Sequence, residues 1–244
     1  MGSDLVGHYS AAAEGERLFR SPHGRLEFLR TRELIRRRLT GAVRVLDIGG
    51  GTGVHAEWLA RDGHSVHLID PVPAHVATAA TLPGVTTMVG DARRLPVADR
   101  TVDVVLMLGP LYHLTEAADR AIALGEAVRV LRPGGLLIAA AISRYLSVLE
   151  TGTDGTLDEA LLPSVREVID TGQYDEHAGF VATHWHTADE LRAELAAAGM
   201  REVEISTASK DRHGPPSTAP VSITSNHWFP PPCTAPAWSN RTPC

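Results

Sequence analysis

Residues 45–56 read VLDIGGGTGVHA, and this short stretch decides the fold class of the chain. It begins with an apolar run that fits a buried strand, passes through a glycine turn, and ends in residues that open a helix. Gly49, Gly51 and Gly53 permit a tight turn and let a ligand approach the backbone closely. A glycine loop between a strand and a helix is typical of a nucleotide-binding site.

Apolar and amphipathic runs alternate along the chain around this loop. We expect strands at 43–48, 65–69, 85–89, 102–108, 136–142 and 201–205. We expect helices at 18–39, 54–60, 73–82, 116–131 and 187–198. This alternation predicts an α/β fold with a doubly wound Rossmann-like sheet. Ligands in such a sheet bind at the carboxyl ends of the strands, beside the point where the strand order reverses.

Three carboxylates stand at the ends of successive expected strands. Asp47 closes the first strand, Asp70 closes the second, and Asp91 follows the third. Residues 51–56 also fit the GxGxxA dinucleotide fingerprint, so a nicotinamide dinucleotide is an alternative ligand. A carboxylate at Asp47 repels a pyrophosphate but suits the ammonium group of a methionine moiety. Asp91, taken alone, fits a helix N-cap equally well.

With these acids, the glycine loop and the turn LRPGGLL at 131–137, the sequence resembles the class I S-adenosylmethionine-dependent methyltransferases from about Arg44 to Ile205. The resemblance implies the sheet of that class, with an N-terminal helical lid, and S-adenosyl-L-methionine as the cofactor. In that family the glycine loop packs against the cofactor, the acid after strand two holds the ribose, and the acid after strand three meets adenine. The implied cofactor-binding residues are Asp47, Gly49, Gly51, Gly53, Asp70, Pro71, Asp91, Ala92, Leu108 and Gly109.

The segment LGPLYHL at 108–114 follows the fourth expected strand. In the family this loop lies between cofactor and acceptor, so the resemblance makes Tyr112 and His113 the candidate catalytic residues. A histidine with an ordinary pKa near 6.5 can take a proton from a hydroxyl or an ammonium acceptor. A histidine that merely bonds a backbone carbonyl under the lid is the alternative. Tyr9, Tyr112 and Trp185 are the candidate substrate-binding residues.

The H-x-H pattern around Trp185 raises the question of a metal. His184 and His186 are two potential ligands, but no third ligand stands at a recognisable spacing. We therefore expect no metal site.

Composition narrows the class of partner. The net charge of −6, from 23 basic and 29 acidic residues, argues against a nucleic-acid surface. No apolar run approaches the ~20 residues of a membrane span. The two cysteines, Cys233 and Cys244, make a disulfide framework unexpected and a cytoplasmic location the default. The expected partner is a small-molecule methyl acceptor, bound by a monomer or a homodimer.

The chain divides into a helical lid at 1–42, a cofactor-binding domain at 43–206 and a proline-rich tail at 207–244. We interpret the tail as the product of a shifted reading frame, because both the composition and the resemblance change near Ser206. Either residues 221–224 pair with the sheet, or the residues after Ser209 are irregular, and the second outcome is favoured.

The expected function is methyl transfer to N, O or C of a small molecule. One alternative is an NAD(P)-binding Rossmann oxidoreductase, although the single lysine, Lys210, leaves no Tyr-x-x-x-Lys pair. The other alternative is a catalytically silent methyltransferase-like protein that serves as a binding partner.

Overall fold

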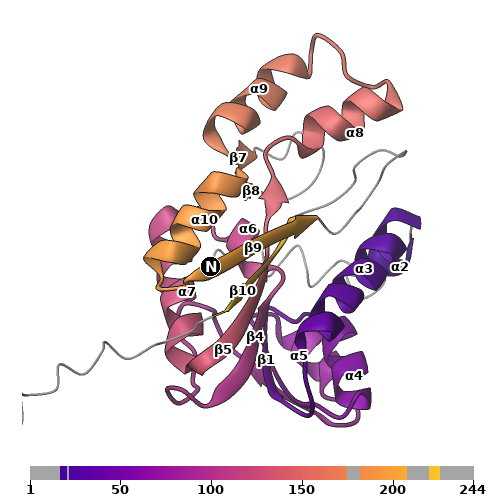
Figure 1. Ribbon diagram of the computed structural model, residues 1–244. Helices are drawn as coiled ribbons and strands as arrows, with labels where there is room; N and C mark the ends of the chain where they lie inside the picture. Colours follow the sequence, from indigo (N-terminus) through magenta and orange to yellow (C-terminus); the bar gives the residue numbers. More distant parts are fainter. Residues whose placement is uncertain (1–16, 21, 175–181, 208–219, 226–244) are drawn as a thin grey trace, which may run out of the picture.

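A seven-stranded sheet forms the centre of the computed structural model (Figure 1), which describes residues 17–20, 22–174, 182–207 and 220–225. The strand order is β3-β2-β1-β4-β5-β10-β9. The strands are β1 (Arg44–Ile48), β2 (Ser65–Asp70), β3 (Val85–Val89), β4 (Val102–Met107), β5 (Leu131–Ala140), β9 (Glu202–Thr207) and β10 (Pro220–Ser225). The first five run parallel to one another, and β10 runs antiparallel to both of its neighbours. The doubly wound Rossmann-like prediction is confirmed.

The central strands are buried on both faces, as their apolar sequences predict. All six residues of β4 are buried, and β1 is buried from Val45 to Ile48. Alternate side chains enter two separate cores, with Val45 in one and Leu46 in the other. A parallel strand covered by helices on both faces needs this nearly continuous apolar run.

Helices cover both faces of the sheet. In Figure 1, α3, α4 and α5 lie on one side, and α7 and α10 lie on the other. Among the described residues, no helix combines the length and apolar character needed to cross a membrane. The flanking helices are α2 (Arg17–Arg20), α3 (Pro22–Arg38), α4 (Val54–Arg61), α5 (Pro73–Ala79), α7 (Ala117–Val130) and α10 (Ala188–Ala197).

An insertion between β5 and α10 adds a small second sheet, for which the sequence provided no prediction. Its strand order is β6-β8-β7, and α8 and α9 project beyond the end of the main sheet in Figure 1. A further short helix, α6, follows β4 and packs against β8. These elements are α6 (Pro110–His113), β6 (Ile142–Ser143), α8 (Leu146–Asp154), α9 (Leu162–Thr171), β7 (Gln173–Tyr174) and β8 (Thr183–His186).

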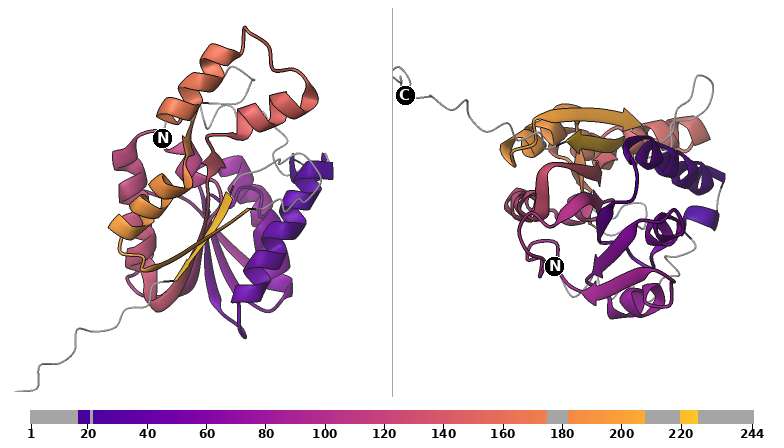
Figure 2. Two further views of the ribbon diagram at one scale, coloured as in Figure 1. Left: turned by 45° about the horizontal axis from the view of Figure 1, so that its top comes forward. Right: turned by 60° about the horizontal axis from the view of Figure 1, so that its bottom comes forward.

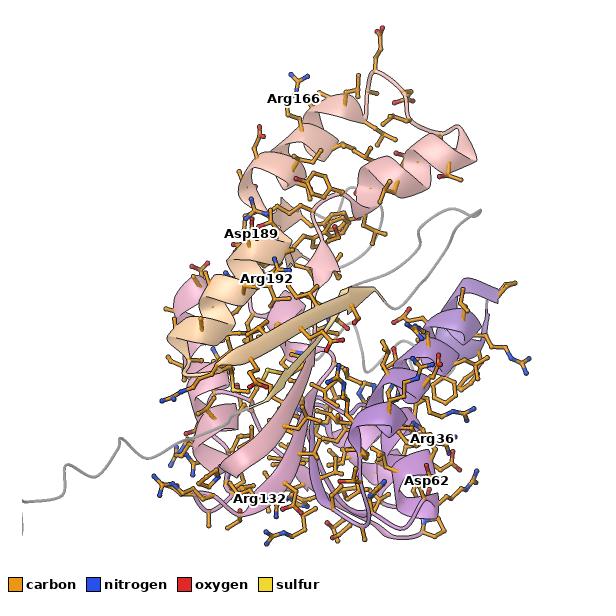
Figure 3. The ribbon with its side chains drawn as sticks, in the orientation of Figure 1. Arg36, Asp62, Arg132, Arg166, Asp189 and Arg192 are labelled. Carbon is orange, nitrogen blue, oxygen red and sulfur yellow. The ribbon has the colours of Figure 1, made fainter. Side chains whose placement is uncertain are left out.

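Arginines attach the N-terminal helix α3 to the rest of the fold. The Arg36 guanidinium donates to both carboxylate oxygens of Asp62, at 2.7 and 2.8 Å, and the two side chains lie together in Figure 3. Arg36 also lies 5.2 Å from the ring centroid of Trp58. Arg38 pairs with Glu204 of β9. The helix is therefore held at two separate elements of the α/β core.

Strand β10 corrects the favoured prediction for the tail. Irregular structure after Ser209 is wrong for Pro220–Ser225, which lie between β5 and β9, beside β9 in Figure 2. Without this segment both neighbouring strands would present open edges, and the alternating run from Val221 supplies the missing partner. Apart from Thr207, the last residue of β9, the rest of the tail lies outside the described residues, and the shifted reading frame stays a hypothesis.

We expect Ser222→Pro to lower the free energy of unfolding by about 1–3 kcal/mol, because proline removes a donor from a strand paired on both sides. Urea denaturation measures the change, with Ser222→Thr as the control that keeps the N–H group. Equal stability of the proline and threonine variants would show that β10 contributes nothing to the sheet.

Candidate functional site

A cavity of about 160 Å³ opens where the strand order reverses, between the carboxyl ends of β1 and β4. The glycine loop, α3 and α6 surround it, as the position of a ligand in a doubly wound sheet predicts. Ten of the predicted site residues line it: Asp47, Gly49, Gly51, Asp70, Pro71, Ala92, Leu108, Gly109, Tyr112 and His113.

The glycines of the loop have different roles. Gly51 has φ of 58°, and a Cβ added there would meet no atom within 4 Å, so this position leaves the backbone open to a ligand. Gly53 has φ of 89°, and its added Cβ would lie 2.5 Å from Leu82. Gly53 is absent from the cavity lining, so its role is close packing at the start of α4.

Asp70 ties the glycine loop to the end of β2. Its carboxylate accepts hydrogen bonds from the N–H groups of Gly51 and Val72, each at 2.9 Å. The Nδ1 atom of His75 lies 3.3 Å from the same carboxylate. Each carboxylate oxygen offers two lone pairs, so Asp70 retains acceptor capacity toward the cavity that it lines.

Asp47 carries a buried carboxyl group in the cavity wall. Only 2% of the residue is exposed, and among the described residues its Oδ2 atom has no hydrogen-bond partner. Burial, and secondarily the charge of Asp70, raises the pKa of Asp47 to about 7. A cation in the cavity would favour the ionised form, so this position is suited to a positively charged ligand group.

Tyr112 and His113 form one wall of the cavity from α6. Their rings lie 4.6 Å apart between centroids. Leu111, between Pro110 and Tyr112, is fully buried and anchors the helix in the main core. The two polar side chains predicted to face an acceptor are therefore carried by a short, well-packed element.

Asp91 is not part of the cavity lining. Its carboxylate accepts from the backbone N–H of Arg93 at 2.9 Å, and the Arg93 guanidinium lies 2.6 Å away. The hydrogen bond from the guanidinium lowers the pKa of Asp91. The backbone contact resembles the capping alternative more than the predicted adenine contact.

Trp185 is likewise absent from the cavity lining. Its ring stacks on Tyr174 at 4.8 Å and an angle of 6°, and its Nε1–H donates to the Thr183 hydroxyl at 2.9 Å. Only 5% of the residue is exposed, so the structure places it in the core of the insertion. Tyr9 lies outside the described residues.

The sequence-based prediction missed several lining residues, of which the lid residues are the most instructive. Leu18, Glu27 and Thr31 reach the cavity from α2 and α3. Glu27 and Thr31 are four residues apart, on the helix face that continues into the buried Leu34. Their polar side chains lie on the helix face that otherwise packs against the core, and this pattern in the sequence could have identified them as site residues. The other missed polar lining residues are Thr52, His55 and His75.

The structure also supplies a third side chain near the H-x-H pattern. His184, His186 and Glu194 offer ligand atoms within 4.8 Å of one another. Glu194 comes from α10, so the spacing of the histidines held no signal for it. Burial and the nearby His186 lower the pKa of His184 to about 4. This cluster lies outside the cavity lining.

The chain is similar to known methyltransferases in sequence and in structure. A family model described as "Methyltransferase domain" matches residues 46–139. An uncharacterized methyltransferase of Mycobacterium tuberculosis is 40% identical over 97 residues, which cover 39% of this chain and 38% of that protein. The first curated relatives are thus spanned over less than half of their length.

Two further comparisons extend over more of the chain. The demethylmenaquinone methyltransferase of Corynebacterium urealyticum is 32% identical over 180 residues, covering 70% of this chain and 74% of that protein. The crystal structure of a SAM-dependent methyltransferase from Methanosarcina mazei has a TM-score of 0.61 at 23% identity, over 79% of this chain and 96% of that one. The second comparison bears on the fold alone.

We expect Asp47→Asn to stabilise the protein at pH 8, by up to about 4 kcal/mol. The pKa of Asp47 is about 7 in the folded chain, against an ordinary value of 3.8, so unfolding releases a proton between these values. Wild-type stability therefore falls as pH rises from about 4 to about 7, and the gain from asparagine should vanish near pH 4.

Urea denaturation at several pH values measures this difference. Asp103→Asn is the control, because that carboxylate accepts from the Arg44 N–H at 2.7 Å and pairs with Arg132 at 2.9 Å. The Asp103→Asn variant should be less stable than the wild type at pH 8, because it weakens these two contacts. If the Asp47→Asn variant were less stable than the wild type at pH 8, the buried charge of Asp47 would not destabilise the folded protein.

Proposed function

Because the chain belongs to the class I S-adenosylmethionine-dependent methyltransferases, we propose that it transfers a methyl group from S-adenosyl-L-methionine to N, O or C of a small-molecule acceptor. The observation that carries this proposal is the carboxyl group of Asp47, which is buried in the cavity wall beside the glycine loop and whose Oδ2 atom has no hydrogen-bond partner among the described residues. A group that is costly to bury and suited to a cation fits a cofactor that carries ammonium and sulfonium groups.

The other lining residues fit the same cofactor. Asp70 has acceptor capacity for ribose hydroxyls, and Gly51 leaves room for close approach to the backbone. Ala92 and Leu108 offer apolar surface for a purine. When bound, the cofactor supplies a methyl group activated on a sulfonium. Gly53 and Asp91 support this site through packing and turn geometry.

The remaining work of the site is alignment, exclusion of water and proton transfer. Methyl transfer is an in-line displacement, so holding the acceptor in line gives much of the acceleration. We assign the orientation of the acceptor to Tyr112 and His113, and the exclusion of water to Glu27 and Thr31 of the lid; all four residues line the cavity. We assign to His113 the removal of a proton from a hydroxyl or ammonium acceptor.

The same residues weigh against a dinucleotide. Asp47 and Asp70 both line the cavity at the loop that would have to hold a pyrophosphate. Two carboxyl groups there disfavour a dianionic ligand.

We further propose that the protein acts in the cytoplasm as a monomer or homodimer, with residues 1–42 as the lid over the site.

Calorimetry separates these ligands. We expect S-adenosyl-L-methionine to bind and NADH not to bind. Asp70→Asn should weaken cofactor binding by about 1.5–3 kcal/mol, because a neutral amide replaces a charged acceptor. His67→Gln, a substitution on β2 outside the cavity lining, is the control. Tighter binding of NADH than of S-adenosyl-L-methionine would reverse the assignment.

An acceptor panel tests the reaction itself, with S-adenosylhomocysteine as the measured product. Quinol-type naphthols come first in the panel, because one relative is a demethylmenaquinone methyltransferase, followed by catechols and amines. On any acceptor that must lose a proton, His113→Gln should lower turnover by roughly 10²–10⁴-fold with cofactor affinity unchanged. Equal turnover of wild type and variant from pH 6 to 9 would leave His113 a packing residue. Cofactor binding without product from any acceptor would favour the silent binding protein.

A further inference from the structure

Two Arg–Glu–His triads lie side by side between β8 and α10. His184 and His186 are two residues apart on a strand, and Glu190 and Glu194 are four apart on a helix, so each pair shares one face. The Nε2 atom of His184 lies 3.0 Å from Glu190, and that of His186 lies 3.2 Å from Glu194. The spacing of the two elements thus produces two parallel histidine–glutamate contacts.

One arginine completes each triad. Arg144 lies 2.6 Å from Glu190, and Arg120 donates to Glu194 through Nη2 at 2.8 Å and through Nε at 2.9 Å. The Arg120 residue is only 2% exposed, so its charge is compensated inside the protein by Glu194.

Arg120 also reaches the wall of the candidate active site. Its Nη1 atom donates to the carbonyl oxygens of Leu114 at 3.0 Å and Thr115 at 2.8 Å. These two residues directly follow His113 at the end of α6, and α6 packs against β8. One guanidinium therefore connects the end of α6 to Glu194 on α10.

The second triad connects different elements. Arg144 donates to the carbonyl oxygen of Trp185 at 3.1 Å and to those of Ile169 and Asp170 at 3.4 and 3.2 Å. These contacts hold the end of α9 against β8. Of the two arginines, Arg120 is the one whose hydrogen bonds, among the described residues, reach the segment that follows Tyr112 and His113.

A metal ion is a poorer explanation of the same cluster. Both carboxylate oxygens of Glu194, the acidic member of the potential ligand set, already accept from Arg120. A divalent cation there would place two more positive charges beside a buried guanidinium. The arginines satisfy the carboxylates without an ion.

We propose that Arg120 is a positioning residue that fixes the Tyr112–His113 wall through the carbonyl groups of Leu114 and Thr115. The effect of Arg120 on catalysis rests on the proposed function, whereas its effect on the position of α6 does not. The planar guanidinium bonds two carbonyls and one carboxylate at the same time, which the single ammonium group of a lysine does not reproduce. Displacement of α6 would misalign the acceptor without altering the Asp47 and Asp70 end of the cavity.

Arg129 provides a matched control on the same helix. It donates to the carbonyl oxygens of Leu95 at 3.0 Å and Val97 at 2.8 Å, and it pairs with Glu126 at 2.6 Å. Its chemistry thus parallels that of Arg120, but it holds a loop at the other end of α7 whose residues do not line the cavity.

The test compares Arg120→Lys with Arg129→Lys by hydrogen–deuterium exchange of the whole protein. We expect Arg120→Lys to speed exchange in peptides covering 110–116 and to leave 95–101 unchanged, and Arg129→Lys to do the reverse. Glu194→Gln, which keeps an acceptor for Arg120 but removes the charge, should act on 110–116 in the same direction and serves if Arg120→Lys does not fold.

The catalytic arm uses the best acceptor from the panel. We expect Arg120→Lys to lower kcat by roughly 10–100-fold, with the cofactor Kd unchanged, and Arg129→Lys to keep the wild-type kcat. Turnover is expressed per cofactor-binding molecule, counted by calorimetric stoichiometry, so that loss of folded protein does not imitate loss of positioning.

Unchanged exchange at 110–116, or an unchanged kcat, in Arg120→Lys would overturn the proposal. One equivalent of zinc retained by the purified wild type and lost in His186→Ala would also overturn it, in favour of a metal centre. If the wild type binds no S-adenosyl-L-methionine, the proposed function fails, whereas the exchange comparison still decides whether Arg120 fixes α6.

Discussion

The hydrogen bond from the Gly51 N–H to the Asp70 carboxylate joins the ends of β1 and β2, and the cavity depends on it. A second bond, from the Gly49 N–H to the carbonyl oxygen of Ile69 at 2.7 Å, runs between the same strand ends. Together they hold the glycine loop folded over the edge of the sheet, with the left-handed backbone conformation that Gly51 permits. The loop then begins α4 on one side of the sheet and leaves the space beside β4 for a ligand.

The same geometry concentrates unfavourable charge. Asp47 is buried in the strand that leads into the loop, and this burial, together with the charge of the second carboxylate Asp70, raises its pKa. An asparagine would be cheaper for folding at that position, because a neutral side chain avoids the desolvation of a charge. Stability is given up at the place where a cationic ligand would recover it, which is the pattern expected of a binding site rather than of a structural core.

How much the sequence predicts depends on whether the signal is local. The parallel strands, the loop and the residues at their ends follow from apolar runs and glycines in single segments, and Asp47, Asp70, Tyr112 and His113 line one cavity, while their roles there stay predictions. Trp185 was misplaced because its partner, Tyr174, belongs to a two-residue strand with no periodicity of its own. The alternating run at 221–224 made pairing with the sheet one of two expected outcomes, but the contact of Val221 with Ala140 is non-local, and the proline-rich composition around the run favoured the other.

The arginines explain how segments without a strong local signal are attached to the predicted core. Helix α7 buries Ala123, Leu124 and Ala127 in the main core, so its position is set by ordinary packing. Arg120 and Arg129 then extend from this fixed helix to backbone carbonyls of two loops, and each is neutralised by a glutamate. A guanidinium suits this task because its five donors serve carbonyls and a carboxylate together, which leaves fewer buried carbonyls unsatisfied. The loop after α6 thereby takes its position from α7 through Arg120, in addition to the packing of Leu114 in the main core. A short wall helix beside a reactive site is in this way fixed twice, by the buried side chain of Leu111 on one face and by a guanidinium at its C-terminal end.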